Sequence, residues 1–397
     1  MPVRTDERWR FANLKAIQLD AYRAPAPVDA ELARTLLDRS REMEAVAGRL
    51  VFANDQLLAH EPVSEALRAK GVLWLPLERA VAEHPELMAR HFMREGAVLG
   101  SQKFAELHRA RVRAGSVLYV PRGVEVELPF EAHHWLCGEA GSAFPHTLII
   151  AEERSRVTLV DVLRSAGEDA GMVCGVNDLW LGAGAQVTYV SVQDWSRRVA
   201  GWQVNATVVG RDARATALAL QLGGAHVRSE NVSRLRGQGG RSDMLAICVA
   251  DGSQEFDQRT LQVHEVEHTS SDLLFKNALD DKARTIFAGL IRVDSGAHKT
   301  DAYQKVRNLL LSDEAEANSA PGLEIEADDV RCTHGATTGQ IEAEELFYLL
   351  SRGIPLRQAQ RLIVNGFLHE VIERLGAPCI GEKLADRVQA KFEAERR

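Results

Sequence analysis

LWLGAGAQVTYVSV (179–192) and VNATVVGRDARATALAL (204–220) are the stretches that decide the fold of this chain. In each stretch a turn of small or charged residues, at 182–185 or 210–213, separates two runs in which apolar and polar residues alternate. Alternation with a period of two is typical of half-buried β-strands. Both stretches therefore predict a strand, a tight turn and a second strand.

The strand–turn pattern recurs at a nearly constant interval along the chain. Further turns of this kind stand at 152–155, 237–240 and 280–283. Equivalent positions after four successive turns, separated by 30, 28 and 27 residues, are Val157, Val187, Ala215 and Ser242. A fixed period of this size indicates a repeat architecture, and a β-helix of short strands and turns fits it. A propeller blade would need a longer repeat, and a β-sandwich remains open as an alternative.

The first 95 residues predict a polar, helical region that precedes the repeats. Between 29 and 46, apolar residues recur at roughly helical spacing: Leu32, Leu36, Leu37 and Met43. The stretch 75–93 predicts two short helices that join at Pro85, and the strand pattern begins near Ala114. The chain accordingly divides into an N-terminal helical region at 1–95, a β-helix core at 96–322, and the end of the core with a C-terminal helical region at 323–397.

After the repeats the sequence becomes helical again. The segment 342–352 is amphipathic, with one side formed by Leu346, Phe347, Leu349 and Leu350. Gly353 suits the position after a helix end, and Pro355 suits the start of the next helix. The segment 356–375 has one broad apolar face: Leu356, Ala359, Leu362, Ile363, Phe367, Val371 and Leu375. A helical hairpin is predicted.

Composition excludes several classes of protein. The formal net charge is −8 and no long Lys/Arg cluster occurs, which argues against nucleic acid as a partner. No uncharged apolar run approaches the roughly 20 residues of a membrane-spanning helix, and the charged N-terminus lacks an apolar signal region. The five cysteines are scattered and never form CxxC, so neither a disulfide framework nor a self-contained four-cysteine site is expected. We expect a reduced, cytoplasmic compartment.

The pentapeptide HEVEH at 264–268 matches the HExxH pattern of zinc proteases, but its context is wrong for that chemistry. The pattern needs a helix, which brings both histidines to one face, whereas the surrounding Val- and Thr-rich alternation predicts a strand. On a strand, His264 and His268 would lie about 13 Å apart and could not share one zinc ion. We expect both on a solvated or turn-facing surface. Walker, dinucleotide-binding and GxSxG motifs are also missing from the sequence.

Cys332 and His334 lie two residues apart in a predicted Gly/Thr-rich turn between a strand-like run and an amphipathic helix. Three interpretations stay open. The pair could act as nucleophile and base, although residues two apart on a strand need not meet and no oxyanion-hole element is evident. They could be structural residues of a turn. As thiolate and imidazole they could bind iron, zinc or a transient cluster, with the missing ligands supplied by a partner chain.

Several segments together resemble the SufB/SufD family of iron–sulfur cluster assembly proteins. ERWRFANL (7–14) is similar to the N-terminal Trp-Arg signature of the family, and LYVPRGVEVELPF (118–130) resembles its first core strands. The segment 272–340 is a near-continuous match, and 323–354 resembles the C-terminal family signature. SufB members typically have His-Glu where this chain has His334 followed by glycine, and they carry an additional upstream cysteine that is missing here. Both differences point to the SufD side of the family.

The resemblance implies a right-handed parallel β-helix flanked by helical regions, and a scaffold rather than an enzyme. It implies a heterodimer with SufB through the β-helix end and a complex with the ATPase SufC. His334 matches a family histidine at the SufB–SufD interface, implicated in iron acquisition or nascent cluster binding, and Cys332 matches its neighbouring cysteine. No permanently bound cofactor is expected, only transient iron or an iron–sulfur cluster.

The resemblance also places the expected SufC-docking face on the C-terminal helical region, around Phe347, Leu350, Arg352 and Ile354. A homodimer that uses the same β-helix end is possible where SufB is missing. The alternative from another class is a β-helix enzyme, either carbohydrate-active or an acyltransferase. Only 6% of the residues are aromatic and no hexapeptide repeat occurs, which speaks against both enzymes.

Overall fold

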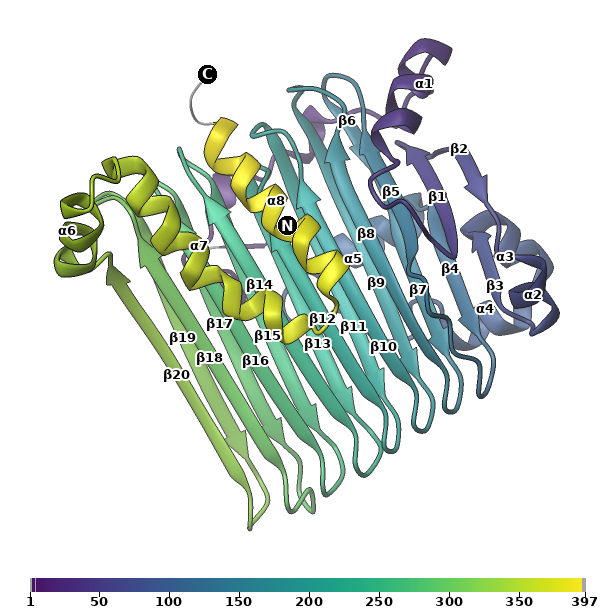
Figure 1. Cartoon of the computed structure of the whole chain (residues 1–397). Coiled ribbons are helices and arrows are strands. Elements are labelled where there is room, and N and C mark those ends of the chain that lie inside the picture. The colour runs from purple at the N-terminus through teal and green to yellow at the C-terminus, as the bar shows by residue number, and fades with distance from the viewer. Residues whose placement is uncertain (1, 4, 395–397) are drawn as a thin grey trace.

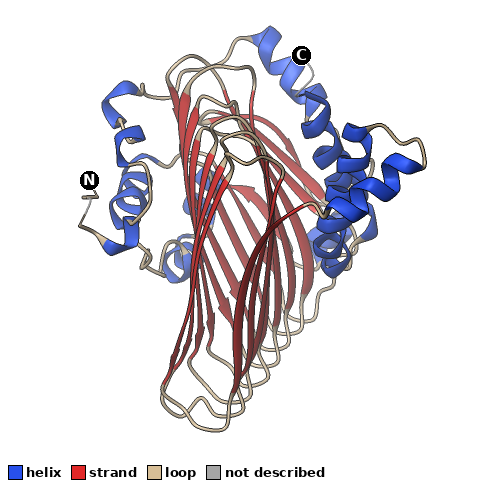
Figure 2. Ribbon diagram, turned by 90° about the vertical axis from the view of Figure 1, so that its left-hand side faces the viewer, coloured by secondary structure: helices blue, strands red, loops and turns tan. Residues whose placement is uncertain are grey.

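The computed structural model describes residues 2–3 and 5–394 and contains two facing β-sheets with helices on both outer surfaces (Figures 1 and 2). Through the core, consecutive strands alternate between the two sheets and neighbouring strands within a sheet run parallel, so the chain winds through about eight coils. The predicted parallel β-helix is confirmed. The β-sandwich alternative is wrong, because strands next to each other in a sheet are one coil apart in the sequence. The right-handed sense stays a prediction.

Both sheets have ten strands, named in their spatial order. Sheet I contains β2 (Gln56–Glu61), β1 (Gly48–Ala53), β5 (Phe130–Leu136), β8 (Arg156–Ser165), β10 (Gln186–Asp194), β12 (Arg214–Gln221), β14 (Arg241–Ala250), β16 (Ser270–Leu279), β18 (Asp301–Leu310) and β20 (Arg331–Gln340). Sheet II contains β19 (Glu316–Ile325), β17 (Arg284–Val293), β15 (Glu255–His264), β13 (His226–Leu235), β11 (Val199–Val209), β9 (Gly171–Leu181), β7 (His146–Ala151), β4 (Gly115–Val120) and β3 (Leu73–Pro76), with β6 (Gly141–Ala143) beside β9.

Helices lie before, between and after these strands. The 3-10 helices are η1 (Glu7–Trp9), η2 (Leu14–Ala16) and η3 (Leu19–Ala21). The α-helices are α1 (Ala30–Arg39), α2 (Glu65–Ala69), α3 (Leu77–Glu83), α4 (Pro85–His91), α5 (Gln102–Arg111), α6 (Ala343–Ser351), α7 (Leu356–Leu375) and α8 (Pro378–Ala394). Within the described residues, no helix is long and apolar enough to span a lipid bilayer.

The register of sheet I follows the sequence period. Val187 pairs with Val157 on one side and with Ala215 on the other, and Ala215 pairs with Ser242. The same row continues, 29, 31 and 30 residues further on, through Ser271, Ala302 and Cys332. The repeat read from four positions therefore extends to the last strand of the solenoid.

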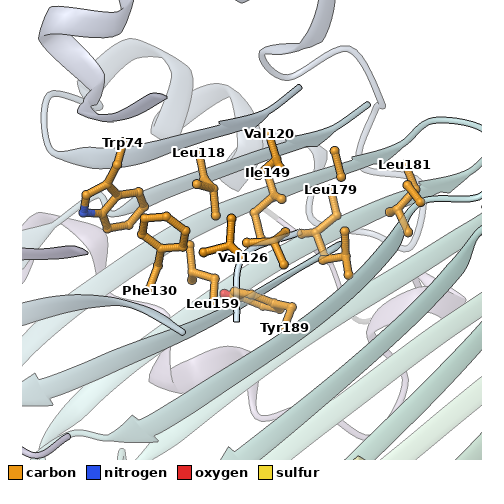
Figure 3. Packing of buried hydrophobic residues seen from close by; sticks show 14 of the residues in the cluster. Trp74, Leu118, Val120, Val126, Phe130, Ile149, Leu159, Leu179, Leu181 and Tyr189 are labelled. Carbon is orange, nitrogen blue, oxygen red and sulfur yellow. The ribbon is translucent and has the colours of Figure 1, made fainter. Parts of the chain in front are cut away.

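The interior between the sheets is apolar near the N-terminal end. Side chains from six strands and one connecting segment meet there (Figure 3): Trp74, Leu118, Val126, Phe130, Ile149, Leu159 and Leu179. Trp74 packs against Phe130 with ring centroids 5.0 Å apart. Burying side chains of this size removes apolar surface from water on every coil, which is the main force that holds stacked coils together.

Each outer surface of the solenoid is covered by a different end of the chain (Figure 2). α7 and α8 cross sheet I, and α8 inserts one residue per turn into its apolar surface: Ile380, Leu384, Val388 and Phe392. The N-terminal arm lies on sheet II, where the Trp9 ring sits 3.9 Å from the Arg228 guanidinium and packs against Phe104. The ERWRFANL segment is thus an anchor that is buried at Trp9.

The N-terminal region is less helical than predicted. The two short helices that join at Pro85 are confirmed as α3 and α4, but β1, β2 and β3 also lie within residues 1–95. All six residues of β1 are buried, so its sequence lacks the alternation that marks a half-buried strand. The helix expected to reach Met43 ends at Arg39.

α7 buries only part of the face predicted for it, at Ala359, Val371 and Leu375. In α7 the buried side chains are Ala359, Val364, Leu368, Val371 and Leu375, whereas Leu356 and Leu362 of the predicted face are about half exposed. Two overlapping apolar stripes occur on this helix, and its packing against sheet I decides which residues of each are buried. A third helix, α8, follows the predicted hairpin.

The HEVEH segment is not helical, as predicted, but its two histidines differ from each other. His264 is the last residue of β15 and is fully buried, with its ring nitrogens 2.7 and 2.9 Å from the hydroxyls of Thr269 and Ser271. His268 lies in the following turn with a φ of 56° and is exposed. The expectation that both lie on the surface is therefore wrong for His264, which faces the interior of the solenoid.

A buried polar cluster joins α5 to sheet II. His108 Nδ1 lies 2.8 Å from the Cys174 carbonyl oxygen, and its Nε2 lies 3.2 Å from His146 Nδ1. His146 Nε2 is 3.5 Å from Asp178 Oδ2, which accepts the Met93 backbone N–H at 2.8 Å. Burial lowers the pKa of His108 to about 4 and raises the pKa of Asp178 to about 7, so the cluster favours uncharged side chains.

We expect Asp178→Asn to stabilise the protein at pH 8 and to have little effect at pH 4. The folded-state pKa of Asp178 is raised, so between pH 4 and 7 the unfolded chain releases its proton while the folded chain keeps it. The wild type therefore loses stability across this window, and the variant gains on it by on the order of a few kcal/mol. Urea unfolding at several pH values measures the difference, with Asp169→Asn, at an exposed site, as control. A difference independent of pH would contradict this interpretation.

Candidate functional site

The two ends of the solenoid differ in how their outermost strands are covered. At the N-terminal end, β2 and β3 pair antiparallel with their neighbours, and α2 to α4 lie beside them (Figure 1). At the C-terminal end, β19 and β20 are the outermost strands of sheets II and I. Both are ten residues long, and within the described residues no further strand follows them. In the described part of the chain, the end formed by β19 and β20 is therefore not covered by a further coil, and we call it the open end.

Cys332 and His334 belong to β20 and face the interior side of this open end. Their register partners on β18 are Ala302 and Gln304, which are 0% and 2% exposed. With no next coil to cover them, Cys332 is half-buried and His334 is exposed. Residues two apart on a strand share a face at a spacing of roughly 6.6 Å. The turn predicted for this pair is wrong, because 331–340 forms a strand that continues the ladder of sheet I, and both side chains lie on its inner face.

Cys332 packs into a small apolar cluster: Ile291, Val293, Ala297 and Ala302. Burial raises the pKa of the Cys332 thiol, and the nearby Asp301 carboxylate adds to the rise. A catalytic cysteine needs a lowered pKa, so this environment disfavours the nucleophile interpretation. A metal cation would have to displace the thiol proton as it binds.

The pair is too small to hold a metal ion by itself. Among the residues that the structure describes, no group of three or more His, Cys, Asp or Glu side chains is placed to bind one. Structural zinc sites and iron–sulfur clusters normally take four protein ligands. A metal at Cys332 and His334 would therefore need ligands from a second chain.

Two exposed apolar residues on β19, on the opposite wall of the open end, were not predicted from the sequence. On β19, Leu323 and Ile325 pair with the buried Ile291 and Val293, yet they are 37% and 41% exposed. They continue two interior rows of sheet II that lack a covering coil. Extending the repeat period along the second strand of each coil would have identified them.

α6 forms a second exposed surface, next to the open end (Figure 1). None of its residues is buried, and Phe347 and Leu350 are 71% and 40% exposed. Tyr348 is also exposed, and the Arg352 guanidinium lies 5.1 Å from its ring. Ile354, also predicted for this face, is half-buried, with its backbone N–H bonded to the Leu349 carbonyl oxygen.

A groove of about 970 Å³ separates α6 from α7 and the outer face of β20. The floor of the groove is fixed by Lys276, whose Nζ lies 2.7 Å from Glu370 Oε2 and 2.5 Å from the Phe367 carbonyl oxygen. Burial lowers the pKa of Lys276, while Glu370 opposes that shift. This ion pair, in which Lys276 is buried and the Glu370 side chain is 37% exposed, ties α7 to sheet I. No residue of α6 is buried.

Comparison with known proteins identifies what this arrangement resembles. The SufBD core domain model of the SUF iron–sulfur cluster assembly system matches residues 134–367. The chain is 32% identical over 393 residues to the iron–sulfur cluster assembly protein SufD of Bacillus subtilis, covering 96% of this chain and 87% of that protein. It is 33% identical over 264 residues to a SufBD family protein of Mycobacterium tuberculosis, covering 64% and 66% of the two chains. A SufBD family protein of Synechocystis is 25% identical over 409 residues, covering 98% and 87%.

Proposed function

Because this chain belongs to the SufB/SufD family of iron–sulfur cluster assembly proteins, on its SufD side, we propose that it is a scaffold subunit of the SUF assembly complex. The observation that carries the proposal is the open end of the solenoid. There, two potential metal ligands, Cys332 and His334, stand beside two unpaired strand edges and exposed core side chains.

The proposed partner at the open end is SufB. Exposed strand edges carry unpaired backbone N–H and C=O groups and favour strand addition from another chain. Covering Leu323 and Ile325 would add the usual gain from burying aliphatic side chains, roughly 1 to 3 kcal/mol each. A paralogous β-helix end would satisfy both requirements at once. A homodimer through the same end is the expected arrangement where SufB is missing.

The proposed cargo is iron or a nascent iron–sulfur cluster, held transiently at the interface between the open end and SufB. Cys332 and His334 would supply a thiolate and an imidazole, both suited to iron, and SufB would supply the remaining ligands. Ligands divided between two chains bind only while the chains are together, which suits a cluster that must be passed on. The chain itself performs no catalysis in this proposal.

The proposed SufC-docking surface is the exposed face of α6 and its C-terminal end, at Phe347, Leu350, Arg352 and Ile354. α6 begins at Ala343, directly after β20 ends at Gln340. A movement imposed on α6 by the SufC ATPase would therefore pull on the strand that carries the proposed metal ligands. The complex would work in the cytoplasm, in keeping with five cysteines that are all free.

Co-expression with SufB and SufC from the same organism tests the proposal. We expect a single particle that contains all three subunits in size-exclusion chromatography with light scattering. A monomer or homodimer that ignores both partners would overturn it and would favour the β-helix enzyme alternative. Omitting SufB alone should leave a smaller particle of this chain with SufC.

A further inference from the structure

Gln304 carries a buried amide whose oxygen has no hydrogen-bond partner, on the strand next to β20. The residue lies on β18 and is 2% exposed. Its Nε2 lies 3.4 Å from the Gly289 carbonyl oxygen on β17, whereas Oε1 is fully buried and, among the described residues, unpartnered. Buried amide oxygens are normally hydrogen-bonded, so this atom requires an explanation.

The amide has a single polar neighbour within sheet I. Gln304 faces the interior, and its inward neighbours on β18 and on the adjacent strands are Ala302, Val306, Leu273 and His334. Only His334 among them has a polar side chain. Residues in register on neighbouring strands lie about 4.8 Å apart, which is close enough for their side chains to meet. Gln304 and His334 also line the same hollow, of about 360 Å³.

Gly289, on the opposite sheet, leaves the space that the amide occupies. A Cβ atom at this position would lie 2.7 Å from Gln304 Nε2 and 2.5 Å from Phe287 Cζ. Both distances are shorter than a normal contact, so a larger residue would displace the amide. Because Nε2 is held at β17, Oε1 is the part of the amide that remains for another donor.

A histidine that binds a metal through one ring nitrogen carries an N–H on the other. A carboxylate or carbonyl oxygen usually accepts this N–H and thereby fixes the orientation of the ring. His334 is exposed, and in the described structure no hydrogen bond joins it to Gln304. Rotation of the exposed ring toward its register neighbour would bring an N–H to Oε1. Neither group would then lack a partner when a covering chain excludes water.

We propose that Gln304 is a positioning residue for His334, with its amide oxygen accepting the ring N–H of His334 while the other ring nitrogen binds iron. This inference rests on the proposed function and adds to it the residue that orients the ligand from inside the solenoid. The acceptor is already buried and held at β17 before the open end is covered, so the ring has a fixed point against which to orient.

The test measures the affinity of cobalt(II), a coloured substitute for iron(II), for the purified complex of this chain with SufB of the same organism. His334→Ala defines the part of the binding that belongs to this site. We expect Gln304→Leu, which removes the acceptor at similar volume, to weaken that part by about tenfold or more. Gln304→Glu keeps an acceptor oxygen and should stay within about threefold of the wild type.

Gln203→Leu is the matched control, because Gln203 Oε1 is also buried and unpartnered among the described residues. It lies on β11, which is separated from β19 by β13, β15 and β17, so cobalt(II) affinity should not change. Gln304→Met fills the same space without an amide and takes the place of Gln304→Leu if that variant lowers the melting temperature.

A loss in Gln304→Leu that Gln304→Glu restores would support the positioning role. An equal loss in Gln304→Glu or in Gln203→Leu would show a structural effect of interior amides and overturn the inference. Unchanged affinity of Gln304→Leu, with a clear effect of His334→Ala, would overturn the inference and leave the proposed function standing. If His334→Ala leaves cobalt(II) binding unchanged, or if no complex with SufB forms, the proposed function fails together with the inference.

Discussion

Replacing His334 by alanine is expected to lower iron–sulfur cluster formation in cells by about 10- to 100-fold while the assembly complex still forms. Mutating a residue that hydrogen-bonds to a metal ligand typically costs 10- to 100-fold in metal affinity or activity, and we expect the loss of a proposed ligand to cost at least as much. His334 is exposed at the open end, so its removal should change the free energy of unfolding by less than about 0.5 kcal/mol. The effect would therefore be on the cargo and not on the scaffold.

The measurement is the activity of a cluster-dependent enzyme in cells whose only SufD is the variant, together with purification of the complex. His369→Ala is the matched control, because His369 is also exposed but lies on α7, paired with Glu373. Cys332→Ser should give a smaller loss, since a half-buried thiol with a raised pKa is the poorer ligand until its proton is displaced. Normal cluster yield from His334→Ala with an intact complex would refute the ligand role.

The double variant Phe347→Glu, Leu350→Glu is expected to abolish SufC binding, with a loss of at least about 100-fold. Two carboxylates in an apolar contact must either be desolvated or keep the partner away, and both are costly. The β core should be unaffected, because no residue of α6 is buried. The melting temperature of the variant should stay within a few degrees of the wild type.

Isothermal titration of purified SufC into each variant measures the loss. Lys383→Glu places the same kind of charge change on an exposed position of α8 and should leave binding unchanged. Arg352→Glu tests the end of the helix separately, where the guanidinium lies against Tyr348. Undiminished binding of the double variant would place SufC elsewhere on the chain.

The two surfaces lie on one continuous segment, which is why both predictions concern the last quarter of the chain. β20 carries Cys332 and His334 and leads into α6, while α7 is fixed to sheet I by the ion pair of Lys276 and Glu370. A force applied to α6 would therefore act mainly on β20, because α7, which follows α6, is held against sheet I. This geometry suits a scaffold in which a movement of SufC at α6 changes access to the interface with SufB at the open end.

The sequence by itself determined the repeat, the strands and turns of the coils from Val157 to Ser242, and the choice of Cys332 and His334 as candidate site residues. Alternation and turn composition are local properties, so the row from Val157 to Ser242 could be read without knowing the fold. Only the tertiary structure decided that this row ends at Cys332, since a row's last member is defined by the lack of a following coil. It also decided which stripe of α7 is buried and that β1 is a strand, because burial depends on how distant segments pack and not on their own periodicity.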